Sequence, residues 1–172
     1  MIFLILYIGT ILGANWAITE YGFVGVGFGL PAPAGVFFAG AAFTLRDLAH
    51  ESLGRRWVMA GIVCGAVLSW WVSSGAIAVA SGTAFLCSEM VDLAVYEPLR
   101  KRRWLTAVFA SNVAGFVVDS ALFLWIAFGS LDFIEGQLLG KAYMTAVAVV
   151  LLWTWRWWRS RCATSVVPYG RR

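Results

Sequence analysis

Six apolar stretches of membrane-spanning length follow one another along this chain, and they leave it few folds to adopt. A helix needs about 20 mostly apolar residues to cross a hydrocarbon core about 30 Å thick, because it rises about 1.5 Å per residue. Of the 172 residues, 61% are hydrophobic and 13% are charged, whereas soluble domains usually have about 25% charged residues. The sequence therefore predicts an all-α integral membrane protein, a bundle of six transmembrane helices.

The predicted helices form one transmembrane domain over residues 1–161, which a cytoplasmic tail of residues 162–172 follows. Their approximate bounds are residues 2–19, 31–53, 57–74, 76–99, 104–129 and 136–155. The second span is expected to begin at Pro31 and Pro33, because prolines are tolerated in the first turn of a helix. Two positions remain open for its membrane exit: Leu45, or about Leu53.

Charged residues between the spans alternate in sign. Basic clusters follow the second, fourth and sixth spans, whereas the opposite loops carry Glu20, no charge, and Asp132 with Glu135. The positive-inside rule then gives a multi-pass protein with both termini in the cytoplasm. The net charge of +4 is thus interpreted as a topology signal, with the lipid bilayer and not nucleic acid as the partner.

The fourth span carries two acids, Glu89 and Asp92, among otherwise apolar residues. A carboxylate near mid-bilayer costs about 2.5 to 3.5 kcal/mol on insertion scales, so two on one helix indicate a site for a polar ligand or an ion. Helical spacing puts polar and aromatic residues on one face beside Glu89, namely Ser81, Phe85, Ser88, Asp92 and Tyr96.

Three further polar residues are candidates for the same site. Asn112 in the fifth span lies about 12 Å from the cytoplasmic end, at the depth of Asp92. Asp47 lies in RDLAHESLGRRW, which is similar to VDLAVYEPLRKRRW around Asp92, so the two aspartates are counterparts if the match is a true repeat. Asn15 in the first span makes either an interhelical hydrogen bond or a ligand contact.

Asp119 and Lys141 lie at similar depths when counted from the opposite side, about 15 Å and about 8 Å. Leaving either charge alone in the membrane is costly, so the sequence predicts an ion pair between them. Glu89, Asp92 and Asp47 have no equally obvious cation, and Arg46 is a candidate partner for one of them.

The remaining motifs exclude several classes of site. The three cysteines form no CxxC pair, and His50 has no partner at metal-ligand spacing, so neither a metal nor a cofactor is expected. No catalytic motif or nucleotide-binding P-loop is present, which favours a non-enzymatic protein. Two GxxxG faces, Gly9 with Gly13 and Gly61 with Gly65, favour close helix packing and leave a homodimer open.

The segment from 85 to 128 resembles the queuosine precursor transporters, the YhhQ-like or vitamin uptake transporter family. The matching residues are Asp92, the basic residues 100–103, Ser111, Asp119 and Phe123, with weaker matches at Asn15, Pro31, Pro33, Asp47, Gly54, Arg55, Arg56 and Lys141. The run 116–118 departs from the family, since a polar residue is expected before Asp119.

The resemblance implies import of a 7-deazaguanine compound such as preQ0 or preQ1 across the inner membrane. Its N–H edge would be accepted by Asp92 or Glu89, with Asn112 making one further hydrogen bond. The ring would stack on Phe85, Tyr96 or Trp16. The predicted substrate site is completed by Asp47, Ser88 and Asn15.

Three other functions fit parts of the sequence. A substrate-binding subunit of an energy-coupling-factor vitamin transporter would also have about six helices, and it would need partner ATPases. A holin would explain the small size and the basic tail but not the acids inside the spans. A membrane enzyme could use Asp and His in acid–base chemistry, but it would lack a recognisable motif.

Overall fold

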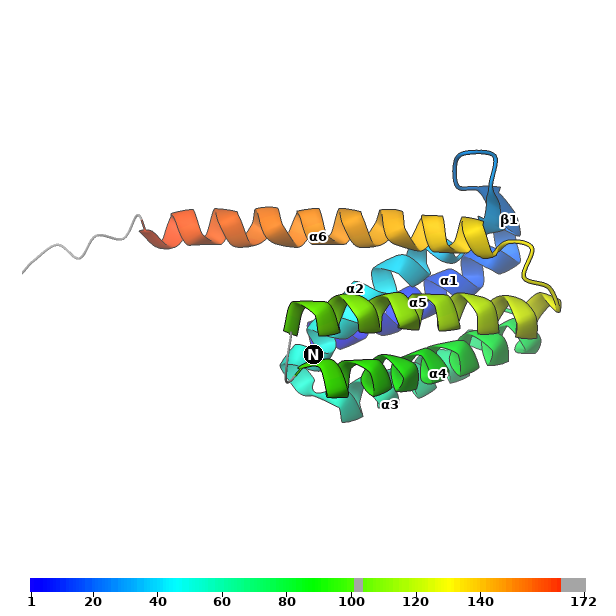
Figure 1. Ribbon diagram of the computed structural model, residues 1–172. Coiled ribbons are helices and arrows are strands. Elements are labelled where there is room, and N and C mark those ends of the chain that lie inside the picture. Colours follow the sequence, from blue (N-terminus) through cyan, green and yellow to red (C-terminus); the bar gives the residue numbers. More distant parts are fainter. Residues whose placement is uncertain (101–103, 165–172) are drawn as a thin grey trace, which may run out of the picture.

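The computed structural model describes residues 1–100 and 104–164 of the chain. In this part the protein is all-α except for one short hairpin (Figure 1). The helices are α1 (Ile2–Tyr21), α2 (Val36–Leu53), α3 (Arg55–Ser69), α4 (Gly75–Arg100), α5 (Trp104–Phe128) and α6 (Ile134–Thr164). The hairpin pairs β1 (Phe23–Gly25) antiparallel with β2 (Pro31–Pro33).

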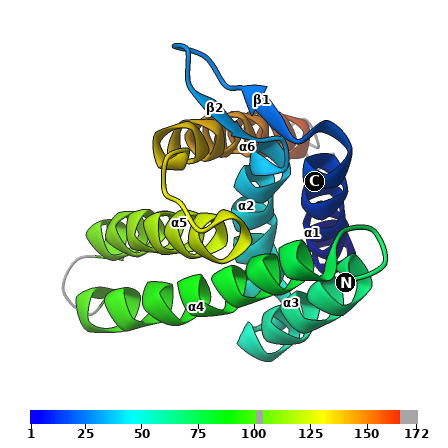
Figure 2. The same ribbon diagram turned by 90° about the vertical axis from the view of Figure 1, so that its right-hand side faces the viewer.

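Helix α2 lies in the middle of the bundle, where it packs against α1, α6 and α3 (Figure 2). Helices α4 and α5 form an antiparallel pair, and α3 packs between α1 and α4. The core is built from apolar side chains of four helices, among them Tyr7, Ile11, Phe43, Ile62 and Phe85. The hairpin and the start of α6 lie at one end of the bundle, and α6 projects beyond the other end (Figure 1).

Three helices in the described part are long and apolar enough to cross a membrane. They are Ile2–Tyr21, Gly75–Leu99 of α4 and Ala110–Phe128 of α5. Helix α3 has only 15 residues, fewer than the usual minimum of about 17, and α2 carries Arg46, Asp47, His50 and Glu51 in its second half. The structure thus supports a helical membrane protein, and the count of six spans stays a prediction.

The start of the second helix differs from the prediction. Pro31 and Pro33 belong to β2, and α2 begins at Val36. The hairpin closes through hydrogen bonds between Val26 and Leu30 and between Leu30 and Gly27, and positive φ angles at Gly27, Phe28 and Gly29 form its tip. Proline is compatible with an edge strand as well as a helix start, so its presence did not distinguish the two.

Two other boundaries also differ. Helix α3 ends at Ser69, before the predicted residue 74, because Val72 and Ser73 donate backbone hydrogen bonds to Ser69 in a turn. Helix α6 continues to Thr164, past the predicted residue 155. Residues 101–103 of the predicted basic cluster and residues 165–172 of the predicted tail lie outside the described part.

Glycines allow α1 to approach its neighbours closely. A Cβ atom on Gly61 or Gly65 of α3 would lie 2.8 Å from Leu4 or Ile11 of α1. The Gly61–Gly65 face is therefore used for packing within the chain. In the other GxxxG pair, Gly13 contacts Phe38 of α2, whereas Gly9 has no such neighbour within 4 Å.

The tightest of these approaches to α1 makes a prediction about stability. A Cβ atom on Gly35 would lie 2.4 Å from the carbonyl oxygen of Ala14, so Gly35→Ala must push the start of α2 away from α1. We expect a loss of about 1–3 kcal/mol, measured as a lower melting temperature of the detergent-solubilised protein. Gly9→Ala is the matched control, because nothing lies within 4 Å of its added Cβ. Equal melting temperatures for the two variants would contradict the prediction.

Candidate functional site

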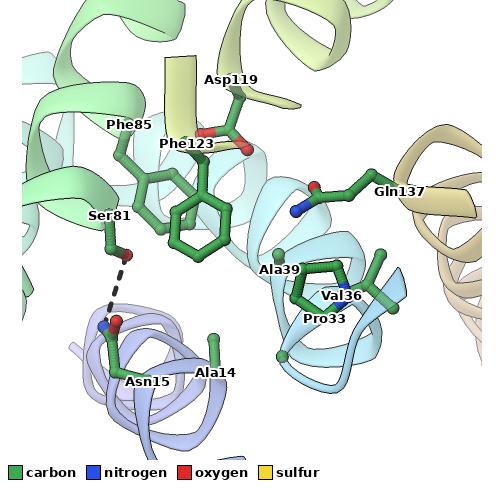
Figure 3. A pocket seen from close by; sticks show the side chains of 11 residues that line it. Ala14, Asn15, Pro33, Val36, Ala39, Ser81, Phe85, Asp119, Phe123 and Gln137 are labelled. Carbon is green, nitrogen blue, oxygen red and sulfur yellow. Dashed lines mark hydrogen bonds between the residues drawn. The ribbon is translucent and has the colours of Figure 1, made fainter. Parts of the chain in front are cut away.

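A small cavity lies inside the bundle near the hairpin, between α1, α2, α4, α5 and α6 (Figure 3). The cavity has a volume of about 30 Å³, which is room for about two water molecules. Its walls combine apolar and polar side chains and come from Ala14, Asn15, Pro33, Gly35, Val36, Ala39, Ser81, Phe85, Asp119, Phe123 and Gln137. Buried polar groups around an apolar cavity are typical of small-molecule sites.

Asn15 connects three helices at the edge of this cavity. Its Nδ2 donates hydrogen bonds to Ser69 Oγ at 2.8 Å, to Ser81 Oγ at 3.3 Å and to the Ile11 carbonyl at 3.0 Å. In the described part no residue donates to its Oδ1. The amide nitrogen is thus committed to the protein, and the amide oxygen is left for a donor in the cavity.

Gln137 of α6 is the polar residue that most directly indicates a ligand. Its side chain is 3% exposed and points toward the cavity (Figure 3). Its side-chain amide has no hydrogen bond with any residue that the structure describes. Leaving a buried polar group without a partner costs about 1–3 kcal/mol, so this amide is suited to a molecule inside the cavity.

Asp119 on α5 lines the cavity and also binds Lys141 of α6. The Lys141 Nζ lies 2.5 Å from Asp119 Oδ2 and donates a second hydrogen bond of 2.7 Å to Ser120 Oγ. All three side chains are buried. Asp119 and Lys141, which the sequence predicts to form an ion pair because of their similar depths in the membrane, are thus in contact.

An aromatic layer of Tyr7, Phe43, Phe85 and Phe116 lies beside this pair. Phe43 is its centre, with ring centroids 6.1 Å from Phe85 and 4.4 Å from Phe116, while Tyr7 meets Phe85 edge-on at 6.5 Å. The Lys141 ammonium lies 5.8 Å from the Phe43 centroid, and the Arg46 guanidinium lies 5.2 Å from it. Phe43 therefore links two buried cations through cation–π contacts.

Arg46 organises a second polar group, the Arg46 cluster of Arg46, Asp47, Glu89, Asp92 and Asn112. Its Nε and Nη2 donate to Asp47 Oδ1 at 3.0 and 2.7 Å, and Nη1 lies 3.0 Å from Glu89 Oε2. Asp92 Oδ1 is farther away, 3.9 Å from Nη2, and Asn112 Oδ1 accepts a bond of 3.4 Å from Nη2. Three acids and one amide thus share one guanidinium.

The cavity and the Arg46 cluster are successive along α2. Val36 and Ala39 line the cavity, Phe43 follows one turn later, and Arg46 comes one turn after that. Four of the predicted substrate residues (Asp47, Glu89, Asp92 and Asn112) therefore belong to the cluster and do not line the cavity. Two others, Asn15 and Phe85, do line it.

The remaining predicted residues lie elsewhere. The Ser88 hydroxyl donates to the Phe85 carbonyl of its own helix at 2.9 Å. Tyr96 is half-buried on α4, one turn beyond Asp92 and away from the cavity lining. Trp16 is 46% exposed and meets Tyr21 edge-on. Phe85 is thus the predicted stacking residue that borders the cavity.

Sequence reasoning missed several residues of the site. Gln137 precedes Lys141 by four positions, so helical spacing would have placed both on the face that the ion pair defines. Phe123 follows Asp119 by four positions on α5 and was identified only as a match to the transporter family, not as a residue of the site. Ser69 and Phe43 gave no such signal, because a serine near a turn and a phenylalanine in an apolar run are common in any bundle.

Comparisons with known proteins give one finding. A family model described as "Putative vitamin uptake transporter" matches residues 70–158, more than half of the chain. No curated protein and no solved structure matches. The matched region contains α4 and α5 and most of α6, and hence Glu89 and Asp92 of the cluster as well as Asp119, Gln137 and Lys141.

Proposed function

The chain belongs to the putative vitamin uptake transporter family, and on this premise we propose that it imports a 7-deazaguanine queuosine precursor, such as preQ0 or preQ1, across the inner membrane. Membership of this family is the basis for proposing that the chain transports a small polar nutrient. The precursor class follows from the resemblance of residues 85–128 to queuosine precursor transporters. Residues Asp92, Ser111, Asp119 and Phe123 carry this resemblance.

The unpartnered amide of Gln137 is the observation that carries the assignment of the binding site. A deazaguanine presents a planar edge of donors and acceptors, which an amide can match with a hydrogen bond of each kind. Asn15 Oδ1 adds an acceptor, and Asp119 is a carboxylate within the same walls. Phe85 and Phe123 offer aromatic faces on which a planar bicyclic ring can stack.

The substrate site proposed here is the cavity and not the Arg46 cluster. Glu89 and Asp47 lie within 3.0 Å of Arg46, so a substrate N–H edge would have to compete with a buried guanidinium for them. The cavity must widen to admit a bicyclic ring, since ligand pockets usually measure about 300–1,000 Å³. Alternating access supplies such a change.

Complementation tests the function directly. The full chain is expressed in a strain that depends on external queuosine precursors and lacks its own importer, and queuosine in tRNA is measured. Restored queuosine at low external preQ0 is expected. No restoration at a membrane level equal to that of a working importer would reject the substrate class. A host without energy-coupling-factor ATPases also tests the alternative subunit function, which could not restore uptake there.

Gln137→Leu separates binding from folding. Because the Gln137 amide has no partner among the described residues, leucine should leave the melting temperature unchanged or higher. Loss of its hydrogen bonds to the substrate, about 1–3 kcal/mol, should lower preQ0 uptake at limiting concentration by about tenfold or more. Glu135→Gln, an exposed change on the same helix, serves as the control. Normal uptake by Gln137→Leu would reject the cavity as the site.

A further inference from the structure

Asp47 of the Arg46 cluster is 51% exposed, so the less exposed part of the cluster sets one cation, Arg46, against two acids, Glu89 and Asp92. Arg46 directs Nε and Nη2 to Asp47 and Nη1 to Glu89, which leaves Asp92 at 3.9 Å as the third acid. The Asp92 side chain is 16% exposed. Its Oδ1 is buried and, like Glu89 Oε2, accepts no hydrogen bond from the described residues, but Glu89 Oε2 lies closer to the guanidinium, at 3.0 Å against 3.9 Å for Asp92 Oδ1. Removing a carboxylate from water is offset only by a close partner, and Asp92 is the acid of the cluster that lies farthest from Arg46.

Tyr7 supplies an independent observation from another helix. Its side chain is fully buried, and its hydroxyl has no hydrogen-bond partner in the described part of the chain. The hydroxyl interacts electrostatically with Arg46 and Glu89 of the cluster and with Asp119 at the cavity. A tyrosine hydroxyl can both donate and accept, so it can hydrogen-bond to an acid in either protonation state.

The surroundings of the cluster favour a proton over a metal cation. A metal ion needs several oxygen ligands at once, whereas Arg46 already occupies oxygens of Asp47 and Glu89 and repels a second cation. No group of three acidic, histidine or cysteine side chains in the described residues has the arrangement of a metal site. A proton needs only one oxygen.

The groups that surround Asp92 leave its carboxylate as the proton acceptor of the Arg46 cluster. Helix α5 faces it with Gly115, whose added Cβ would lie 3.8 Å from the Asp92 Cβ, and with Asn112 at the Arg46 guanidinium. The charged residues of α3, Arg55 and Arg56, are exposed at its first turn. The acids within 4 Å of Arg46 are Asp47 of α2 and Glu89 and Asp92 of α4, and Tyr7 of α1 interacts electrostatically with Arg46 and Glu89.

We infer that Asp92 binds a proton that moves with the substrate, so that the Arg46 cluster is the coupling site of a proton-driven importer. The inference rests on the proposed transport function. Closing the bundle over an ionised Asp92 is costly, so the closed form is reached with the proton bound, and closure around a substrate carries the proton with it. Phe43 and Tyr7 join the cluster to the cavity, where the substrate is held.

Infrared spectroscopy tests the proton site without any substrate. The full chain in liposomes is titrated with acid, and the carbonyl stretch of a protonated carboxyl group is followed. Because acid also protonates the other carboxylates, the band of Asp92 is taken from the difference between spectra of two proteins. We expect it when the spectrum of Asp92→Asn is subtracted from that of the wild type or of Glu135→Gln, and not when Asp92→Asn is the only protein titrated. A wild-type protein without the band, or an Asp92→Asn protein that keeps it, would overturn the inference.

Transport under a pH gradient tests the coupling. With one pH unit of gradient, acidic outside, one proton per substrate should concentrate labelled preQ0 up to about tenfold inside liposomes. Asp92→Asn should equilibrate preQ0 but not concentrate it, while Glu135→Gln should concentrate it like the wild type. A sodium gradient at equal pH should have no effect, and accumulation driven by sodium would overturn the choice of a proton.

Different results would reject the proposed import of preQ0 and the inferred proton coupling at Asp92. If preQ0 exchanges across the liposome membrane but the pH gradient has no effect, the coupling inference is wrong and the proposed function stands. If preQ0 does not exchange at all, the proposed substrate is wrong, and the infrared band still decides whether Asp92 takes a proton.

Discussion

Replacing Lys141 with methionine is expected to remove most of the folded protein from the membrane. The variant leaves Asp119 buried, 4% exposed, without the ammonium that lies 2.5 Å from it. Breaking a buried ion pair by removing one partner costs about 3–5 kcal/mol, a large part of a total stability of about 5–15 kcal/mol. The measurement is the monodisperse peak of a fluorescent fusion in size-exclusion chromatography, normalised to total expression.

Double variants show whether the unpaired charge is the cause. Asp119→Asn with Lys141→Met removes both charges, and Asp119→Lys with Lys141→Asp exchanges them. Both pairs should recover folded protein relative to the single variants, because neither leaves one charge alone. Glu135→Gln removes an exposed charge from the same helix and should change nothing. If neither double variant exceeds Lys141→Met, the loss has another cause, such as the packing of the long lysine side chain.

The partnership of Asp119 and Lys141 is the part of the site that the sequence specified best. Each charge stands in an apolar span, and residue counting from the same side of the membrane gives similar depths. The cost of an isolated buried charge then limits the choice of partner to few residues. Depth and helical period were sufficient here, because the two helices carry no competing charges at that level.

The role of Arg46 could not be obtained in this way. It stands where the second span has two equally good membrane exits, so its depth was not defined. Its importance depends on α2 lying in the middle of the bundle, packed against α1, α3 and α6, and no periodicity in the sequence reports the order of helices in space. Arg46 was expected to serve one acid, whereas the structure places three within 4 Å of it.

The cavity was also beyond sequence reasoning, because short-range steric details define it. Pro33 reaches its wall only because Pro31–Pro33 forms a strand in place of a helix start. That strand is held by the first turn of α6, where a Cβ on Gly136 would lie only 2.1 Å from the Pro31 carbonyl oxygen. Such contacts between segments about 100 residues apart leave only a glycine as their trace in the sequence.

Arg46→Gln is expected to be as damaging as the loss of Lys141. It leaves Glu89, 2% exposed, as a buried acid without a cation and the half-buried Asp92, 16% exposed, without its cation, and it removes the donors that Asp47 and Asn112 use. A cost of at least about 3–5 kcal/mol follows, seen as loss of the monodisperse chromatographic peak. Arg46→Lys should recover only part of the folded protein, because a single ammonium group lacks the planar guanidinium geometry that reaches three acids at once.

Removing the acids distinguishes charge balance from packing at this position. Arg46→Gln combined with Glu89→Gln and Asp92→Asn should recover folded protein, since no buried charge then lacks a partner, while proton-driven accumulation stays lost. Arg55→Gln, an exposed arginine on α3, should leave both properties unchanged. A triple variant that folds no better than Arg46→Gln would show that Arg46 acts mainly through its packing on Phe43. The charge imbalance would then no longer support the proposed proton coupling, because Asp92 would not depend on the Arg46 guanidinium that Asp47 and Glu89 also contact.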